Sequence, residues 1–404
     1  MTKHLTVALT AVSTLTFVLA CGFANAGPLT ADDPRVLEFE SGLIDRNERG
    51  LDDARRWSIH ERLASYGVPG AAVAIVRNGE IAWLEGYGTK LAGRDDPVDG
   101  DTVFSVGSVS KVINAVLILR LVAEGRVDLD TNVNEYLESW RVPGSRYNAE
   151  QDVTLRRILS HTAGFNVHGF ADYPPGAELP TTVEILDGRR PAMNDAVRLM
   201  STPGELMDYS GGGITVSQAV VEDVTGLSYA AAARRYVFEP LGMTRSTFVN
   251  PLPASHGNIA RAHDERGRPT ALPRGWEAMP EQAASGLWTS ARDLARFLIA
   301  INDEDSGAFL PRELRDDMLT REPQSWHGLG PRLNGAGTTR VFHHGGANDS
   351  YRAWIEGHVE SGDGLVVLTN GSEGAWLRSE IRKSVEDAFD WPVKSDGGFE
   401  EPEL

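Results

Sequence analysis

A serine and a lysine, Ser108 and Lys111, stand three residues apart at the start of the apolar stretch "FSVGSVSKVINAVLILRLVAEG" (residues 104–125). On a helix, residues at i and i+3 share one face, so the two side chains come within hydrogen-bond reach. A serine hydroxyl is a weak nucleophile that needs an adjacent base, and an amine partly removed from water can act as that base near neutral pH. The spacing therefore fits nucleophilic catalysis. It also fits a structural alternative, an N-cap serine followed by a solvated lysine.

Further motifs around the pair decide between these readings. In chain order they are "ILSHTAGF" (158–165), "PGELMDYSGGG" (203–213), "EPLGMTRSTF" (239–248), "ASGLWTSARDLARFL" (284–298) and "FHHGGANDSYRAW" (342–354). Together with "FSVGSVSK", the chain resembles the penicillin-recognising serine hydrolases over roughly residues 55–390. That family includes class C β-lactamases, D,D-peptidases, D-aminopeptidases and related esterases. A lone S-x-x-K is unspecific, whereas six motifs in the family's order are specific.

The resemblance implies a role for three residues. Ser108 attacks a carbonyl carbon, and Lys111 accepts the serine proton or holds a partner ready for it. Tyr209, in "DYSGGG", matches the tyrosine of the family's second motif and carries a proton to the leaving group. A phenol has a free pKa near 10, so this role requires a nearby cation, such as Lys111, that favours the phenolate.

The third motif, "HHGGANDSY", implies the opposite wall of the site. Aligned on "HGGAN", His344 takes the place of the family's lysine, and Gly346 lets substrate approach the strand closely. The backbone N–H of Ala347 then pairs with that of Ser108 as an oxyanion hole. A shift of one residue places His343 there instead. Neighbouring strand residues point to opposite faces, so only one histidine lines the cleft, and we favour His344.

Two departures from the β-lactamases bear on the substrate. This chain has Tyr209-Ser210-Gly211 where they have Tyr-x-Asn, and a titratable histidine where they have a fixed cation. Both weaken recognition of a β-lactam. We therefore expect an acyl-enzyme hydrolase whose substrate is an ester, a D-residue amide or peptide, or a β-lactam, with the last the least favoured. The alternative is a penicillin-binding or sensing module that is acylated without efficient turnover.

Other features predict no additional chemistry. We interpret His161 in "SHTAGF" as structural, and no ligand spacing joins His161, His343 and His344 into a metal site. We expect no cofactor and a small-molecule or peptide substrate. The net charge of −18, from 57 acidic and 39 basic residues, argues against nucleic acid as a partner.

The expected fold is α+β. Residues 71–88 read as two strands joined at Asn78-Gly79, a strong hairpin signal, and residues 108–124 read as a buried helix stopped by Gly125. The remaining expected helices lie at 53–66, 195–200, 214–226, 228–242, 290–302 and 377–391, and the remaining strands at 338–344, 350–358 and 364–371. This order predicts a β-lactamase-like, mostly antiparallel sheet built from both chain ends, flanked by helices, with an all-helical lobe inserted at about 128–280.

The ends of the chain differ from its middle. Residues 1–26 combine a basic start, a short apolar run and "ANA", which predicts a signal peptide cleaved after Ala26 and an exported, periplasmic or secreted protein. The alternative is a lipoprotein with a lipid anchor at Cys21, the single cysteine. We expect one domain over 27–390, with no membrane span in the mature chain, and an acidic tail over 391–404.

Overall fold

The computed structural model describes residues 28–270, 276–303 and 309–392. The predicted signal peptide, Cys21 and residues 393–404 of the predicted tail lie outside the described residues. The packed chain reaches Trp391, whose indole N–H donates to Asp363 at 2.9 Å.

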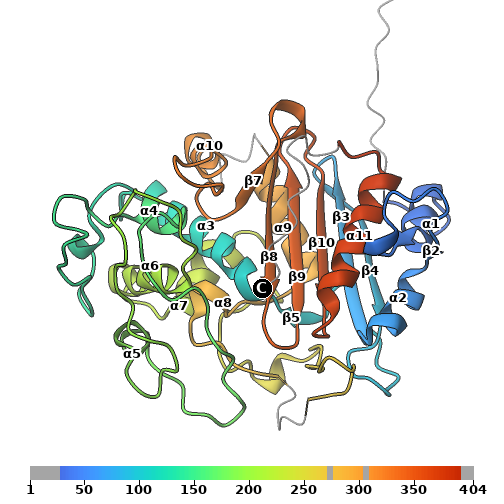
Figure 1. Cartoon of the computed structure of the whole chain (residues 1–404), viewed down its shortest axis with the longest axis horizontal. Coiled ribbons are helices and arrows are strands. Elements are labelled where there is room, and N and C mark those ends of the chain that lie inside the picture. The colour runs from blue at the N-terminus through green and yellow to red at the C-terminus, as the bar shows by residue number, and fades with distance from the viewer. Residues whose placement is uncertain (1–27, 271–275, 304–308, 393–404) are drawn as a thin grey trace, which may run out of the picture.

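The centre of the described structure is a six-stranded antiparallel sheet in the order β4-β3-β10-β9-β8-β7 (Figure 1). Its strands are β3 (Gly70–Arg77), β4 (Glu80–Gly88), β7 (Arg332–Asn334), β8 (Val341–Ala347), β9 (Arg352–His358) and β10 (Gly364–Thr369). Two strands come from the N-terminal part of the chain and four from the C-terminal part, which confirms the predicted plan. The short edge strand β7 was not expected.

The β3–β4 hairpin turns at Asn78 and Gly79, which have φ angles of 51° and 74°. Positive φ at both central turn residues is what Asn-Gly tolerates and what matches the twist of the paired strands. The sequence prediction of this hairpin is confirmed.

Helices cover both faces of the sheet (Figure 1). The helices of the first face are α1 (Pro34–Ser41), α2 (Ile59–Tyr66) and α11 (Gly374–Ala388), and those toward the second face are α3 (Ser110–Ala123) and α9 (Ala291–Asn302). Alternate strand residues enter the two cores: Val73 and Ile75 pack with the first set, Ala72 and Ala74 with the second. This is the period of two that a sheet buried on both faces requires.

The predicted helices differ from the structure at several bounds, and one predicted helix is absent. The helix expected over 53–66 begins only at Ile59, because Ser58 and Glu61 form a capping box there, and Arg56–Trp57 pair as strand β2 with β1 (Leu43–Ile44). The helix expected from Ser108 begins at Ser110, after a 3₁₀ turn over Gly107–Val109.

The helix expected at 195–200 is absent, because the chain is extended there. Val197 and Leu199 are buried while Arg198 and Met200 are exposed, an alternation typical of a strand. Leu199 bridges to Phe165, and the N–H of Val197 donates to Leu186. Tertiary contacts with Phe165 and with Leu186 of the helix over 182–187 therefore determine the conformation here.

The inserted lobe lies beside the β7 edge and packs on α3 (Figure 1). Its helices are α4 (Leu155–Leu159), α5 (Thr182–Asp187), α6 (Gly211–Thr225), α7 (Tyr229–Ala233), the π-helical turn Arg234–Phe238 and α8 (Gln282–Ser285); α10 (Arg312–Met318) follows later in the chain. A two-stranded pair, β5 (Val103–Ser105) with β6 (Trp288–Ser290), joins the segment before Ser108 to the segment after α8. That pairing brings the start of α3 and α8 together.

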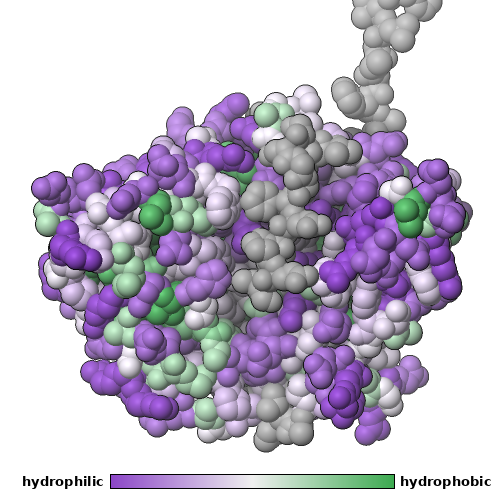
Figure 2. All heavy atoms as spheres, in the orientation of Figure 1, coloured by the Kyte–Doolittle hydropathy of each residue, from purple (hydrophilic) through white to green (hydrophobic). Residues whose placement is uncertain are grey.

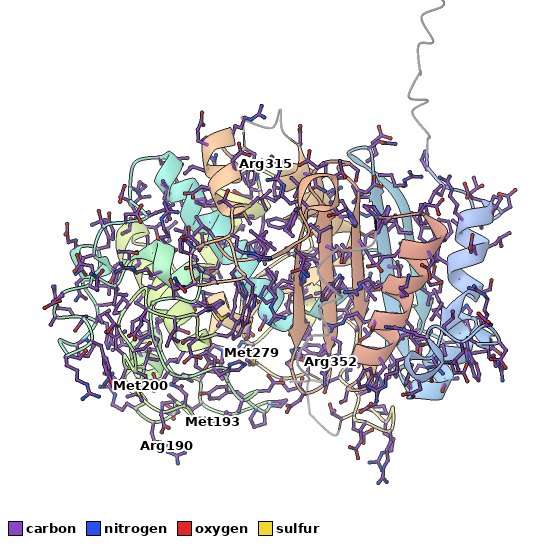
Figure 3. All side chains as sticks on the ribbon, turned by 45° about the horizontal axis from the view of Figure 1, so that its top comes forward. Arg190, Met193, Met200, Met279, Arg315 and Arg352 are labelled. Atoms are coloured by element: carbon purple, nitrogen blue, oxygen red, sulfur yellow. The ribbon has the colours of Figure 1, made fainter. Side chains whose placement is uncertain are left out.

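The surface facing the viewer in Figure 2 is mostly hydrophilic, with small separate hydrophobic patches over the inserted lobe. Met193 and Met200, labelled in Figure 3, are exposed residues on loop segments of this lobe. Scattered apolar residues of this kind are normal on a folded surface. Within the described ranges, every helix is too short or too polar to cross a bilayer.

Candidate active site

Ser108 lies half-buried in the 3₁₀ turn Gly107–Val109, directly before α3. Because Gly107 and Gly346 have no side chain, this turn packs directly against the end of β8. A Cβ atom on Gly107 would come within 2.6 Å of the Ala347 carbonyl oxygen, and one on Gly346 would come within 1.9 Å of the Val106 carbonyl oxygen. The turn that carries the serine and the strand that carries Ala347 are therefore in direct backbone contact, which requires glycine at both positions.

Lys111 is only 2% exposed, and its amine has two partners. Nζ donates to Ser108 Oγ at 3.0 Å and to the carbonyl oxygen of Ala284, in α8, at 2.8 Å. A buried amine needs such partners to offset its lost hydration. The first turn of this buried helix can contain a lysine because two oxygens, the Ala284 carbonyl of α8 and Ser108 Oγ, accept hydrogen bonds from its amine.

Tyr209 precedes α6, whose N-cap Ser210 accepts a hydrogen bond from the N–H of Gly213 at 2.9 Å. Lys111 Nζ lies 4.9 Å from the centroid of the Tyr209 ring. The Arg332 guanidinium, from the edge strand β7, lies 5.9 Å from the same centroid. The structure thus brings the predicted serine, lysine and tyrosine together, with a second cation that the sequence did not indicate.

The two adjacent histidines of β8 face opposite sides of the sheet. The His344 ring centroid lies 6.3 Å from that of Tyr209, whereas the His343 ring stacks on Trp354 at 4.9 Å, on the α11 side. His344 Nδ1 lies 2.6 Å from the Gly345 carbonyl oxygen, so Nδ1 carries a proton and donates it. Burial, and then the charge of Arg332, lowers the pKa of His344 well below its usual value, so the ring is neutral at pH 7.

Three further histidines surround Tyr209, and we call the four together the histidine cluster. Their ring centroids lie 4.2 Å (His161), 5.0 Å (His168), 6.0 Å (His327) and 6.3 Å (His344) from that of Tyr209. Burial lowers all four pKa values, that of His327 to about 3. Of the four, the sequence offered a signal for His344, in "HGGAN", and for His161, in "SHTAGF"; His168 and His327 stand alone in loops without motif spacing. In the part of the chain described, no group of three His, Cys, Asp or Glu residues is arranged to hold a metal ion.

A second polar region lies beyond the turn that follows β8. This pocket of about 480 Å³ is lined by Asp172, Pro174, Asp264, Glu265, Thr270, Glu277, Asp349, Ser350, Ser372 and Glu373, and we call it the acidic pocket. Burial raises the pKa of Asp172 to about 8. Burial, and then the charge of Asp172, also raises the pKa of Glu281 to about 8. Figure 3 shows Arg352, at the start of β9, at this end of the sheet. None of the six predicted site residues lines this pocket.

Comparison with known proteins gives consistent matches. A family model described as Beta-lactamase matches residues 46–388. Esterase EstB from Burkholderia gladioli is 31% identical over 306 residues, which cover 66% of this chain and 73% of the esterase. Penicillin-binding protein 4 from Amycolatopsis lactamdurans is 30% identical over 233 residues, covering 57% of this chain. This chain spans only 58% of that relative's length.

Solved structures agree on the fold. A D-amino acid amidase from Ochrobactrum anthropi SV3 aligns with a TM-score of 0.67 at 22% identity, covering 82% of this chain and 97% of the amidase. An octameric penicillin-binding protein homologue from Pyrococcus abyssi aligns with a TM-score of 0.64 at 24% identity, covering 81% and 78%. At these identities the likeness establishes the α+β fold alone. Because the family model matches most of the chain, this protein belongs to the beta-lactamase family of penicillin-recognising serine hydrolases.

Proposed function

We propose that the chain is a serine hydrolase that forms an acyl-enzyme on Ser108 and cleaves carboxylic esters. The observation that carries the proposal is the 3.0 Å contact between Lys111 Nζ and Ser108 Oγ, in a lysine that is 2% exposed. An amine held on the serine oxygen in a nearly dry site is placed to take the hydroxyl proton as the oxygen attacks.

Each step has a residue for it. Ser108 Oγ bonds to the ester carbonyl carbon while its proton passes to Lys111. The backbone N–H groups of Ser108 and Ala347 stabilise the oxyanion, since their two segments are in backbone contact. Tyr209, beside Lys111, passes the proton to the alkoxide leaving group. Water then attacks the acyl-enzyme along the reverse route, and the acid and Ser108 are released.

The site favours an ester over a β-lactam. The third-motif position carries His344, which is buried and neutral, so it offers no charge to a β-lactam carboxylate. The second motif reads Tyr209-Ser210-Gly211 and lacks the amide side chain of the β-lactamases. The curated relative with 31% identity is named an esterase, which supports the same choice. D-residue amides remain the second substrate class of the proposal.

One observation favours a second candidate, an acylated sensor without turnover. The relative with 30% identity is named a penicillin-binding protein. Such a module uses the same serine and lysine for acylation, so the two candidates differ only in the rate of deacylation.

We also propose that the protein acts outside the cytoplasm, after cleavage behind Ala26. The support is the basic, apolar and small-residue order of residues 1–26. Intact mass measurement of the protein exported from a bacterial host tests this. A mature chain starting at Gly27 supports cleavage, a lipid-modified Cys21 supports the lipoprotein alternative, and an unprocessed chain in the cytoplasm contradicts both.

The function is tested by time-resolved mass spectrometry with p-nitrophenyl butyrate and, separately, with a chromogenic cephalosporin. Wild type is compared with Ser108→Ala and with Ser145→Ala, a change at an exposed serine of the inserted lobe. We expect an adduct on the peptide containing Ser108, many turnovers of the ester, and little or none of the cephalosporin. Ser108→Ala should lose turnover, and Ser145→Ala should match wild type.

Other outcomes discriminate between the candidates. Labelling that stops at one equivalent per chain with either reagent supports the sensor. Equal ester turnover by Ser108→Ala, or an adduct on another residue, refutes Ser108 as the nucleophile.

A further inference from the structure

His161 has an unusual backbone for a non-glycine residue. It stands two residues after α4 and has a φ angle of 60°, in the left-handed region that only a few per cent of non-glycine residues occupy, mainly Asn, Asp and His. It is also 2% exposed. A conformation of this kind persists only where the surrounding contacts hold it. Besides its contacts with Ile158 and His327, three contacts of His161 lead to one residue.

Three contacts from His161 bracket Tyr209. The N–H of Asp208 donates to the His161 carbonyl oxygen at 2.8 Å. The N–H of Ser210 donates to His161 Nδ1 at 3.2 Å. The imidazole packs against the Tyr209 ring with centroids 4.2 Å apart and planes at 34°. His161 therefore holds the residue before Tyr209, the residue after it and the phenol ring itself.

The protonation of the ring follows from the same contacts. Because Nδ1 accepts the N–H of Ser210, the neutral imidazole carries its proton on Nε2. His161 Nε2 is buried and has no hydrogen-bond partner among the described residues. An unsatisfied buried donor is unfavourable, and an apolar side chain would avoid it. The benefit of a histidine here is thus its Nδ1 acceptor and its flat ring, both directed at Tyr209 and its neighbour.

We propose that His161 is a positioning residue for Tyr209: its carbonyl oxygen, Nδ1 and ring together hold the phenol beside the Lys111 amine. The proposal rests on the proposed role of Tyr209 in proton transfer. It goes beyond the interpretation of His161 as structural. Proton transfer depends steeply on the distance and angle between the two groups, so a misplaced phenol slows the chemical steps while leaving the substrate pocket intact.

Three substitutions separate the contributions of His161. His161→Ala loses the acceptor and the ring and strains the backbone. His161→Gly relieves the strain but restores neither contact. His161→Asn tolerates a positive φ, and its side-chain oxygen can accept from the N–H of Ser210. The readouts are kcat and KM for p-nitrophenyl butyrate, corrected for the folded fraction measured by circular dichroism.

The matched control is His263→Ala. His263 is fully buried, and its Nε2 likewise accepts from a backbone N–H, that of Ala92, at 3.1 Å. We expect kcat to fall about 10- to 100-fold in His161→Ala and His161→Gly, with KM changed less than about twofold. His161→Asn should recover most of kcat. His263→Ala should lower thermal stability and leave kcat per folded molecule unchanged.

Adding each change to Tyr209→Phe distinguishes the two proposals. A residue that acts through Tyr209 has little further effect on kcat once the phenol oxygen is gone, so the two effects should not add. Full additivity, a loss confined to KM, or wild-type kcat in His161→Gly overturns the positioning role while leaving the proposed function intact. If Tyr209→Phe alone keeps wild-type kcat, the proposed role of Tyr209 fails, and the positioning role fails with it.

Discussion

The histidine cluster and two buried carboxyls, Asp172 of the acidic pocket and Glu281, avoid charge by opposite means. Burial lowers the pKa values of the histidines, so the rings give up their protons, and it raises those of Asp172 and Glu281 to about 8, so the carboxyls keep theirs. At pH 7 a free histidine is already mostly neutral, whereas a free carboxyl is fully ionised. Burying the histidines is therefore inexpensive at neutral pH, and burying the carboxyls is not.

The difference indicates a division of roles. The groups around Ser108 and Tyr209 can be enclosed without a large loss of stability, which leaves them free to be arranged for chemistry. The carboxyls of Asp172 and Glu281 lower stability, and within the described ranges neither forms a hydrogen bond or ion pair with a side chain of the predicted site residues. Changes in the first region should alter turnover, and changes in the second should alter stability alone.

The largest expected effect is that of Lys111→Met. It keeps the length of the side chain and removes the amine that contacts Ser108 Oγ and the Ala284 carbonyl oxygen. Turnover of p-nitrophenyl butyrate should fall about 10²- to 10⁴-fold, the usual contribution of an acid–base group. Stability to urea should hold or rise, because an apolar side chain of similar volume needs no partners when buried. If the variant keeps more than a tenth of wild-type kcat, Lys111 is not the general base.

Glu281→Gln should have the next largest effect, which is on the free energy of unfolding. Both carboxylate oxygens of Glu281 are buried and without hydrogen-bond partners in the described part of the chain. The folded carboxyl keeps its proton up to about pH 8, while the unfolded one loses it near pH 4.5, so the wild type loses stability as pH rises through this window. Between pH 5 and 8 the variant should gain about 3 kcal/mol relative to wild type in urea unfolding.

The control for that measurement is Glu178→Gln, at an exposed position of the inserted lobe. Its stability relative to wild type should not change between pH 5 and 8. A Glu281→Gln variant that behaves like this control would show that Glu281 is ionised in the folded protein, and the comparison between the two regions would lose its acidic half.

His327→Gln tests the other half, with the opposite sign. The folded histidine has a pKa of about 3 and the unfolded one about 6.5, so the unfolded chain binds the extra proton and stability falls as pH drops below 6.5. Glutamine does not titrate, and its amide can replace the Nδ1 contact to the Gly330 carbonyl oxygen. From pH 6.5 to 5, wild type should lose about 2 kcal/mol more than the variant.

An exposed histidine on α2 supplies the control for this experiment. His60→Gln should follow wild type at every pH in urea unfolding. If His327→Gln follows it too, the buried ring is protonated in the folded state at pH 5, and the neutrality of the histidine cluster is disproved.

The sequence predicted the elements whose signals are local. Asn78-Gly79 needs only its own φ angles to turn a hairpin. Ser290, the first residue of the helix expected over 290–302, caps α9 by accepting from the N–H of Asp293. It missed what depends on distant partners. Residues 195–200 are extended because Val197 bonds to Leu186 of α5 and Leu199 pairs with Phe165. Strand β7 forms only because β8 lies beside it.

The same distinction applies to the candidate site. The spacing of Ser108 and Lys111 was enough to predict their contact, because they are three residues apart on one turn. The histidine cluster was not predictable, since His168 and His327 contact Tyr209 from loops about 160 residues apart in sequence. Buried pKa values depend on the same long-range packing and carry no signature in a single sequence.

Ser350→Ala should have the smallest effect, and it tests whether the two regions are independent. Ser350 Oγ donates to Glu277 at 3.0 Å, and the residue stands three positions after Ala347, whose N–H is proposed for the oxyanion hole. Losing one hydrogen bond should lower stability by about 1 kcal/mol, measured as a shift in Tm. We expect kcat to be unchanged, because the Asn348 amide, which donates to Ser105 Oγ at 2.6 Å, anchors the turn between them. A fall in kcat with Tm preserved would show that a change in the acidic pocket affects the position of the Ala347 N–H through the turn at Asn348. The two regions would then not be independent.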